Sequence, residues 1–157
     1  MKAARTIFIA IDPGASGAAA VKWTDGSVCV EPFLSEIEML EFMRIVRENA
    51  DAEGADVRVF IEKVGGFVGG IGNTGSSMFN FGRNYGYYIG VCDALGFATR
   101  FVAPGVWQKK YPTRAKSAKE KAAHKRELKE HAARLYPKLK VTLASADALL
   151  ILDWASA

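Results

Sequence analysis

The order of strand-like and helix-like segments constrains the fold of this chain more than any other feature. Three segments rich in β-branched and aromatic residues come first, and each has the length and composition of a strand: residues 6–11, 17–23 and 27–33. Asp25-Gly26 separates the second from the third, and this dipeptide is typical of a tight hairpin. The sequence therefore begins with three predicted strands, of which the last two form an expected hairpin.

Helices and strands alternate through the rest of the sequence. Two further strands are predicted at residues 57–64 and 98–102. Apolar residues at helical spacing predict four helices, over residues 36–50, 76–92, 117–136 and 146–154. Because the 157 residues contain no linker-like segment, we expect one domain, residues 1–157. The predicted fold is α/β, with a mixed five-stranded sheet and helices on both faces.

The composition argues against several classes of protein. No apolar run approaches the roughly 18 residues that cross a bilayer, so we expect no membrane association. Cys29 and Cys92 are too few for a disulfide framework and lack the spacing of a metal finger. Such sparse cysteine usage is typical of a reducing compartment, and we expect a cytoplasmic protein.

Basic residues are concentrated near the end of the sequence. The segment from Lys109 to Lys140 contains 12 Lys and Arg and 3 Glu, a net charge of +9, whereas all other residues together carry a net charge of −5. A block this basic attracts phosphate polyanions, but a solvated helix face has the same composition. The charge alone does not decide between the two interpretations. His124 and His131, which lie in this block, are interpreted as surface residues.

Three acidic residues occupy positions that are unusual for solvated carboxylates. Asp12 closes a strand, Glu62 lies within a hydrophobic strand, and Asp147 begins an apolar helix. Each alone is explained as a turn residue, an edge-strand charge or a first-turn acid favoured by the helix dipole. A helix packed across the ends of two adjacent strands would bring all three together. Clustered carboxylates repel unless a cation lies between them, and such hard oxygen ligands select Mg²⁺ or Mn²⁺.

Glycines repeat every four residues, at Gly82, Gly86 and Gly90, in one predicted helix. Each costs a helix about 1 kcal/mol relative to alanine, so three on one ridge suggest that another backbone approaches closely. Two interpretations remain open at this point. The ridge packs tightly on the sheet of the same chain, or it forms a helix–helix contact between two subunits.

Three motifs resemble, in order and spacing, the acidic motifs of RuvC-type Holliday junction resolvases, which belong to the RNase H-like superfamily. They are Ile9-Ala-Ile-Asp-Pro-Gly14 with Ser16-Gly17, Phe60-Ile-Glu-Lys63, and Ala146-Asp-Ala-Leu-Leu150. The sequence is most similar to the phage and poxvirus-related branch. There a Pro…Trp element, here Pro104 and Trp107, precedes a Lys-rich helix that ends in a run such as Ala133-Arg-Leu-Tyr-Pro137. The resemblance spans nearly the whole chain and implies a single RNase H-like nuclease domain.

The resemblance implies a structure-selective endonuclease that resolves four-way junctions or other branched DNA by paired phosphodiester hydrolysis. It implies a homodimer that requires Mg²⁺ or Mn²⁺, uses no nucleotide cofactor, and acts in the cytoplasm of a bacterium or a phage-infected host cell. Asp12, Glu62 and Asp147 would hold the metal ions, and Lys125 would offset phosphate charge in the transition state. Lys125 is equally well interpreted as one more solvated lysine.

The residues expected to contact DNA are mostly basic side chains from the charged block and its surroundings. Phe67 would stack on an unpaired base at the crossover, although a loop aromatic can also fold back onto the core. The full set is Phe67, Arg83, Lys109, Lys110, Arg114, Lys116, Lys119 and Lys121.

One departure from the family pattern leaves a second hypothesis open. Members of the family place a fourth acid or a histidine a few residues before the final aspartate, and this chain has Ala144 there. Asp153 is not expected to substitute, because it lies roughly 120° around the helix from Asp147 and about 9 Å along it. The alternative is a catalytically weakened or inactive junction-binding protein of the same fold. An actin-like ATPase shares the first motif but needs a second phosphate-binding half, for which we expect no room.

Overall fold

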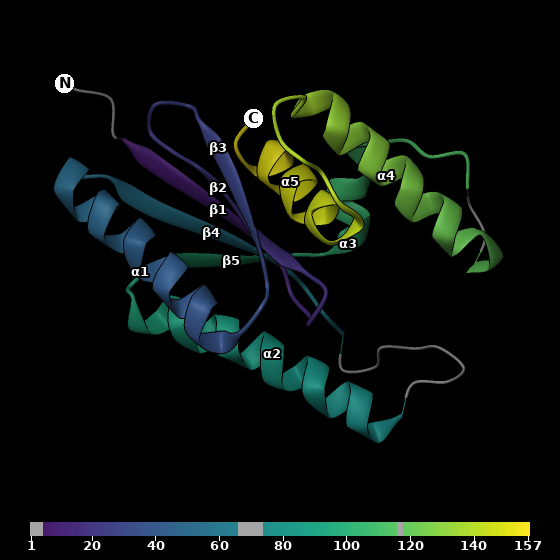
Figure 1. Cartoon of the computed structure of the whole chain (residues 1–157), viewed down its shortest axis with the longest axis horizontal. Helices are drawn as coiled ribbons and strands as arrows, with labels where there is room; N and C mark the ends of the chain where they lie inside the picture. The colour runs from purple at the N-terminus through teal and green to yellow at the C-terminus, as the bar shows by residue number, and fades with distance from the viewer. Residues whose placement is uncertain (1–4, 66–73, 116–117) are drawn as a thin grey trace.

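The computed structural model describes residues 5–65, 74–115 and 118–157 (Figure 1). Its five strands form one sheet in the order β3-β2-β1-β4-β5. β1 pairs antiparallel with β2, and β2 with β3, whereas β4 and β5 run parallel to β1. The predicted mixed five-stranded sheet is thus confirmed. Its strands are β1 (Thr6–Asp12), β2 (Ala18–Lys22), β3 (Val28–Pro32), β4 (Asp56–Glu62) and β5 (Ala98–Val102).

Helices cover both faces of the sheet, as the sequence predicts. α1 (Glu36–Glu53) and α2 (Gly75–Ala94) lie on one face, below the sheet in Figure 1. α3 (Pro104–Trp107), α4 (Lys121–Leu135) and α5 (Leu143–Ala155) lie on the other. Two hydrophobic clusters fill the space between the sheet and the helices. One lies between the sheet and α1 and α2, and the other between the sheet and α3, α4 and α5. No helix in the described part of the chain is long and apolar enough to cross a membrane.

Alternation along β1 divides its side chains between these two clusters. Ile7, Ile9 and Ile11 pack toward α1 and α2, while Ala10 packs toward α5 on the opposite face. β2 likewise places small alanines under α5, which is itself apolar over most of its length. Small side chains allow a helix to lie close to a sheet, so α5 rests directly across β1 and β2.

All four predicted helices differ from the observed ones at their boundaries; α1 runs to Glu53 rather than residue 50, and α2 is Gly75–Ala94 rather than residues 76–92. α5 begins at Leu143, three residues early, because the side chains of Thr142 and Ser145 form a capping box at its start. The helix predicted over residues 117–136 is a short 3₁₀ turn, Ala118–Glu120, followed by α4. α3 and the adjoining 3₁₀ turn, Gln108–Lys110, were not predicted, since four residues are too few to show a helical period.

The glycine ridge of α2 faces away from the sheet. A Cβ atom placed on Gly82, Gly86 or Gly90 meets nothing within 4 Å. All three residues are exposed. The interpretation that this ridge packs tightly against the sheet of the same chain is therefore wrong.

Candidate active site

Asp12 and Glu62 lie side by side at the ends of two parallel strands. The register of β1 and β4 pairs Ile11 with Ile61, and the next residue on each strand is the acid. Neighbouring strands are about 4.8 Å apart, so the two backbones are close at this point. Ile11 and Ile61 belong to the core under α1 and α2, and side chains alternate along a strand. Both carboxyl groups therefore point to the face that α5 covers.

Asp147 reaches the same place from α5. It lies in the second turn of that helix, after the Thr142 cap. Asp12, Glu62 and Asp147 together line a cleft of about 370 Å³, whose other wall is formed by the turn after β1 and by α4. The structure therefore brings together the three acids that the sequence singled out.

Burial and mutual repulsion make these acids hold their protons unusually firmly. Burial, followed by the charges of Asp147 and Glu62, raises the pKa of Asp12 to about 8. Burial also raises the pKa of Glu62 to about 7, with Asp147 contributing in the same direction. The pKa of Asp147 is raised by burial as well. Burial is the main cause in each case, because it disfavours the ionised form of a carboxyl group.

Trp107 is a site residue whose role the sequence did not predict. Its indole Nε1 donates a hydrogen bond of 2.8 Å to Oε2 of Glu62, and the ring is fully buried. This bond opposes the effect of burial on the pKa of Glu62, because it stabilises the ionised carboxylate. The only signal in the sequence was the Pro104…Trp107 spacing, which says nothing about a partner 45 residues away.

Two neighbouring residues of α4 bring positive charge and an imidazole into the cleft. Lys125 lines it, and its charge lowers the pKa of all three carboxyl groups. His124 also lines it and lowers the pKa of Asp147, while its Nδ1 lies 2.8 Å from Oγ1 of Thr113. His124 is thus a half-buried residue of the cleft wall rather than part of a fully solvated helix face. His131 lies outside this cleft, with Nε2 2.8 Å from the carbonyl oxygen of Pro112.

The donor set fits a hard divalent cation. Three desolvated carboxyl groups converge on one cleft. A bound divalent cation would replace their protons and would offset the repulsion between the ionised carboxylates. Within the described ranges, however, no three His, Cys, Asp or Glu side chains already form a ligand cluster. Leu143, rather than Ala144, lines the cleft beside Asp147, and neither residue carries a donor.

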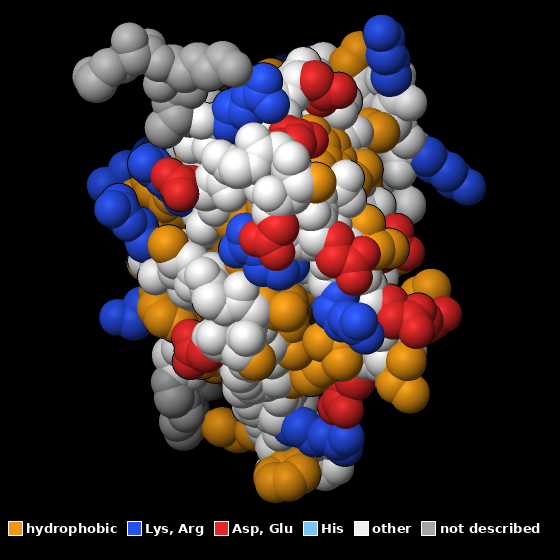
Figure 2. All heavy atoms as spheres, turned by 90° about the vertical axis from the view of Figure 1, so that its left-hand side faces the viewer, with side chains coloured by type: hydrophobic (Ala, Val, Ile, Leu, Met, Phe, Trp, Pro, Cys, Tyr) orange, Lys and Arg blue, Asp and Glu red, His pale blue; other side chains and the backbone are white. Residues whose placement is uncertain are grey.

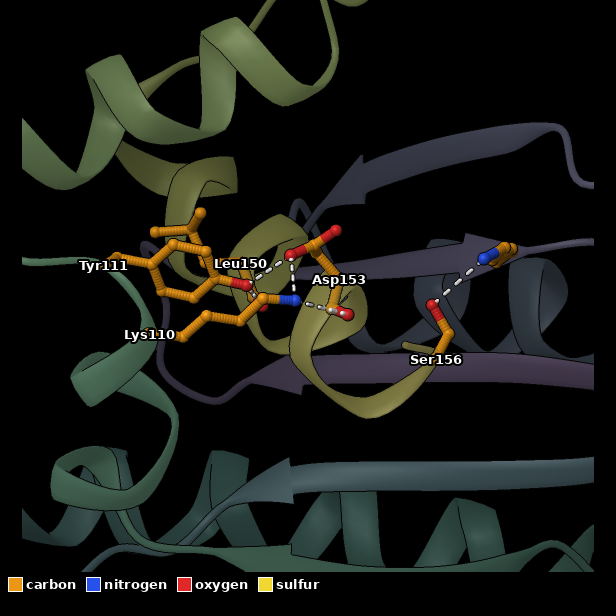
Figure 3. A network of polar contacts seen from close by, with 6 residues as sticks. Lys110, Tyr111, Leu150, Asp153 and Ser156 are labelled. Carbon is orange, nitrogen blue, oxygen red and sulfur yellow. Dashed lines mark hydrogen bonds and ion pairs between the residues drawn. The ribbon is translucent and has the colours of Figure 1, made fainter.

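Asp153 is committed to another network, shown in Figure 3. Its Oδ2 accepts a hydrogen bond of 2.6 Å from the Tyr111 hydroxyl and forms an ion pair of 2.7 Å with Lys110. Although partial burial raises the pKa of Asp153, these partners hold it below its ordinary value. The expectation that Asp153 does not serve as the fourth acid agrees with this geometry, since it does not line the cleft.

The residues expected to contact DNA are distributed unevenly around the site. Lys121 lines the cleft, and Lys119, Lys109 and Arg114 are exposed on the same side of the sheet as α4. Lys110 is paired with Asp153, and Arg83 forms an ion pair of 2.9 Å with Glu36 of α1. Phe67 and Lys116 lie outside the described residues.

The end of the molecule opposite the cleft has a different character. Figure 2 shows the end at which β1 and β4 begin, where acidic and basic side chains are interspersed around apolar patches. Mixed charges of this kind do not attract a polyanion as a one-sign surface does.

Two solved structures have the same overall fold. One is described as Thermus thermophilus RuvC in complex with a Holliday junction substrate; it is 14% identical, with a TM-score of 0.53, over 96% of this chain and 92% of that one. The other is a Thermus thermophilus RuvC structure, 17% identical, with a TM-score of 0.52, over 96% of this chain and 93% of that one. No protein-family model and no curated protein sequence matches. The fold is therefore RuvC-like, as the acidic motifs suggested.

Proposed function

We propose that this protein is a Mg²⁺- or Mn²⁺-dependent endonuclease that hydrolyses phosphodiester bonds in branched DNA, four-way junctions above all. The observation that carries the proposal is the convergence of three desolvated carboxyl groups, Asp12, Glu62 and Asp147, beside Lys125 in one cleft. The RuvC-like fold supports it, since one similar structure holds a Holliday junction substrate. The Pro104…Trp107 element and the Lys-rich helix are the features that favour the phage and poxvirus-related branch.

In this proposal Asp12, Glu62 and Asp147 hold the divalent ions, which supply water activation and charge stabilisation when bound. The three carboxyl groups must release protons for this, so cation affinity rises with pH through the range of their raised pKa values. Trp107 fixes Glu62 in a defined orientation through its indole hydrogen bond. Lys125 offsets the negative charge that accumulates on the phosphate during cleavage.

DNA would approach from the side of α4. Lys121 lines the cleft itself, and Lys119 is exposed in the 3₁₀ turn that precedes α4. Lys109 and Arg114 extend the positive charge around this side of the protein, and Lys110 contributes where its ion pair with Asp153 opens. Arg83, on α2 and paired with Glu36, and Lys116, which lies outside the described residues, are also proposed to contact DNA. Phosphate contacts of this kind give affinity without reading sequence. Phe67 is assigned to stacking at the crossover, which would supply preference for a branched structure.

We also propose that two copies act together as a homodimer. Paired incision of a four-way junction requires two equivalent sites related by a two-fold axis. The open ridge of Gly82, Gly86 and Gly90 on α2 supports a close helix–helix contact, because another backbone can approach it without meeting side chains of the same chain.

A second candidate function is a junction-binding protein of the same fold with weak or absent cleavage. Ala144 stands where a fourth ligand would be expected, and the described residues contain no ready-formed cluster of three metal ligands. Such a protein would retain the basic surface and the fold but bind divalent ions poorly.

Cleavage of labelled substrates tests both candidates. A four-way junction, a linear duplex and a flap of matched length are incubated side by side with Mg²⁺, Mn²⁺ or EDTA. The proposal predicts symmetric paired cuts in the junction, little cleavage of the duplex, and none in EDTA. Tight junction binding without cleavage in either metal would favour the second candidate, and equal cleavage of all three substrates would contradict structure selectivity.

A further inference from the structure

The turn that follows Asp12 is unusually tight. The amide of Gly17 donates a hydrogen bond of 3.0 Å to the carbonyl oxygen of Gly14, which closes the turn between β1 and β2. Gly14 has a φ of +119°, a conformation that L side chains rarely adopt. A Cβ on Gly17 would lie 2.0 Å from the carbonyl oxygen of Asp12. The backbone of this turn therefore sits directly against the strand end that carries the acid.

The side chain of Asn84, on α2, holds this turn from the face of the sheet opposite α5. Oδ1 of Asn84 accepts a hydrogen bond of 2.6 Å from the amide of Gly14, across 70 residues of sequence. Asn84 is only 7% exposed, and it is one of two buried polar residues in the described chain. A buried amide that loses its acceptor is costly, so this contact favours one position of the turn.

Phe81, almost one helical turn before Asn84, supports the same glycine. Its ring edge lies 3.1 Å from the position that a Cβ on Gly14 would occupy, and the ring also lines the cleft. The turn is thus held by a hydrogen bond to α2, and a ring from the same helix fills the space that a side chain on Gly14 would need. No comparable polar tether from α1 reaches this turn in the described residues.

We propose that Asn84 is a positioning residue that holds Asp12 in place for cation binding by tethering the turn at Gly14 to α2. The inference rests on the proposed function, because it assigns the tether to the cation site of that function. Groups that orient metal ligands through hydrogen bonds typically change metal affinity or activity by about 10–100-fold when they are removed. Asn84 acts one step further from the ion, through the backbone, so an effect near the lower end is expected.

Three variants test the tether. Asn84→Ala removes the acceptor, Asn84→Asp keeps an acceptor oxygen in a side chain of nearly the same shape, and Asn80→Ala makes the same truncation at an exposed position one turn earlier on α2. Mn²⁺ affinity is measured by calorimetric titration without DNA, and junction binding and cleavage are measured on the same preparations. Circular dichroism confirms that each variant is folded.

Asn84→Ala is expected to weaken Mn²⁺ binding about 10-fold, with unchanged junction affinity in EDTA. Asn84→Asp recovers most of the Mn²⁺ affinity, and Asn80→Ala matches the wild type. Wild-type Mn²⁺ affinity in a folded Asn84→Ala protein would overturn the positioning role and leave the proposed function standing. A wild-type protein that binds no Mn²⁺ would overturn the proposed function and this inference together.

Discussion

The indole of Trp107 donates its hydrogen bond to Glu62, so a fully buried ring holds one acid of the cleft. The bond crosses from α3 to the end of β4. It acts against burial, which raises the pKa of Glu62 to about 7. The ionisation of the site thus depends on a contact that lies inside the core rather than in the open cleft.

Trp107→Phe is expected to raise the pKa of Glu62 further. A hydrogen bond to a charged group contributes about 1.5–3 kcal/mol, and one pKa unit corresponds to about 1.4 kcal/mol, so the rise is about one to two units. Less carboxylate is then ionised at a given pH, and the acid limb of the pH profile of cleavage moves to higher pH. Trp154→Phe is the control, because Trp154 packs on Phe60 in the same core without lining the cleft. An acid limb that stays in place would contradict the role of this bond.

Asp12 makes the metal-free protein less stable as pH rises. Its pKa is about 8 in the folded state against 3.8 for an ordinary aspartate. The folded state therefore holds a proton that the unfolded chain releases, and stability falls between about pH 4 and pH 8. Asp12→Asn cannot ionise, so its melting temperature should exceed that of the wild type by an amount that grows across this window. About 3 °C or more of growth is expected in EDTA.

Asp25→Asn is the matched control for that series. Asp25 is exposed, and hydrogen bonds from Ser27 hold its pKa below the ordinary value. Its carboxylate is almost fully ionised in both states above about pH 5, so the difference from the wild type stays constant from there to about pH 8. If the melting temperatures of Asp12→Asn and the wild type change with pH in parallel, Asp12 is not the group that holds the proton.

The fold could be predicted from the sequence because local patterns determine most of it. Alternation in β1 and β4, apolar periodicity in α1 and turn signals at Asp25-Gly26 each reflect short-range rules. The ordered motifs also indicated Asp12, Glu62 and Asp147. The register that sets Asp12 beside Glu62 follows from two parallel strands whose acids come at the same distance along each strand.

The rest of the site could not be predicted because it depends on contacts between distant segments. Trp107 meets Glu62 across 45 residues, and Asn84 meets Gly14 across 70. Nothing in the sequence distinguishes His124 from the other residues of a charged helix. Its position in the cleft beside Asp147 depends on how α4 packs. The outward direction of the glycine ridge likewise depends on which side of α2 packs on the sheet, which spacing alone leaves open.

Lys119 and Lys121 should carry part of the DNA affinity. Replacing both with Gln is expected to weaken binding to junction and duplex alike. The slope of log affinity against log salt should fall by roughly 0.9 for each phosphate of a duplex arm that is no longer neutralised. Arg5→Gln with Arg44→Gln removes the same charge from exposed positions outside the cleft and should leave the slope nearly unchanged. Equal slopes for the lysine variant and the wild type would show that DNA binds to another part of the surface.

Gly86→Leu tests the proposed dimer. A side chain at Gly86 meets nothing within its own chain, so the monomer should fold normally. The added bulk would separate two helices that approach backbone to backbone, and sedimentation should shift from dimer toward monomer. Asn80→Leu adds a similar side chain about 120° around the helix and should not shift it. A wild-type protein that sediments as a monomer at micromolar concentration would contradict the dimer.

Asp12 and its neighbouring acids are proposed to be needed for metal-dependent cleavage but not for DNA binding. A substitution of Asp12 should therefore remove cleavage and leave DNA binding intact. The decisive measurement is junction cleavage by Asp12→Asn under single-turnover conditions in Mn²⁺, with junction affinity measured in parallel in EDTA. We predict that cleavage falls at least about 1000-fold, on the scale expected when a catalytic metal ligand is removed, while affinity changes less than about 2-fold. Cleavage by Asp12→Asn at a rate comparable to the wild type would show that the active site lies elsewhere.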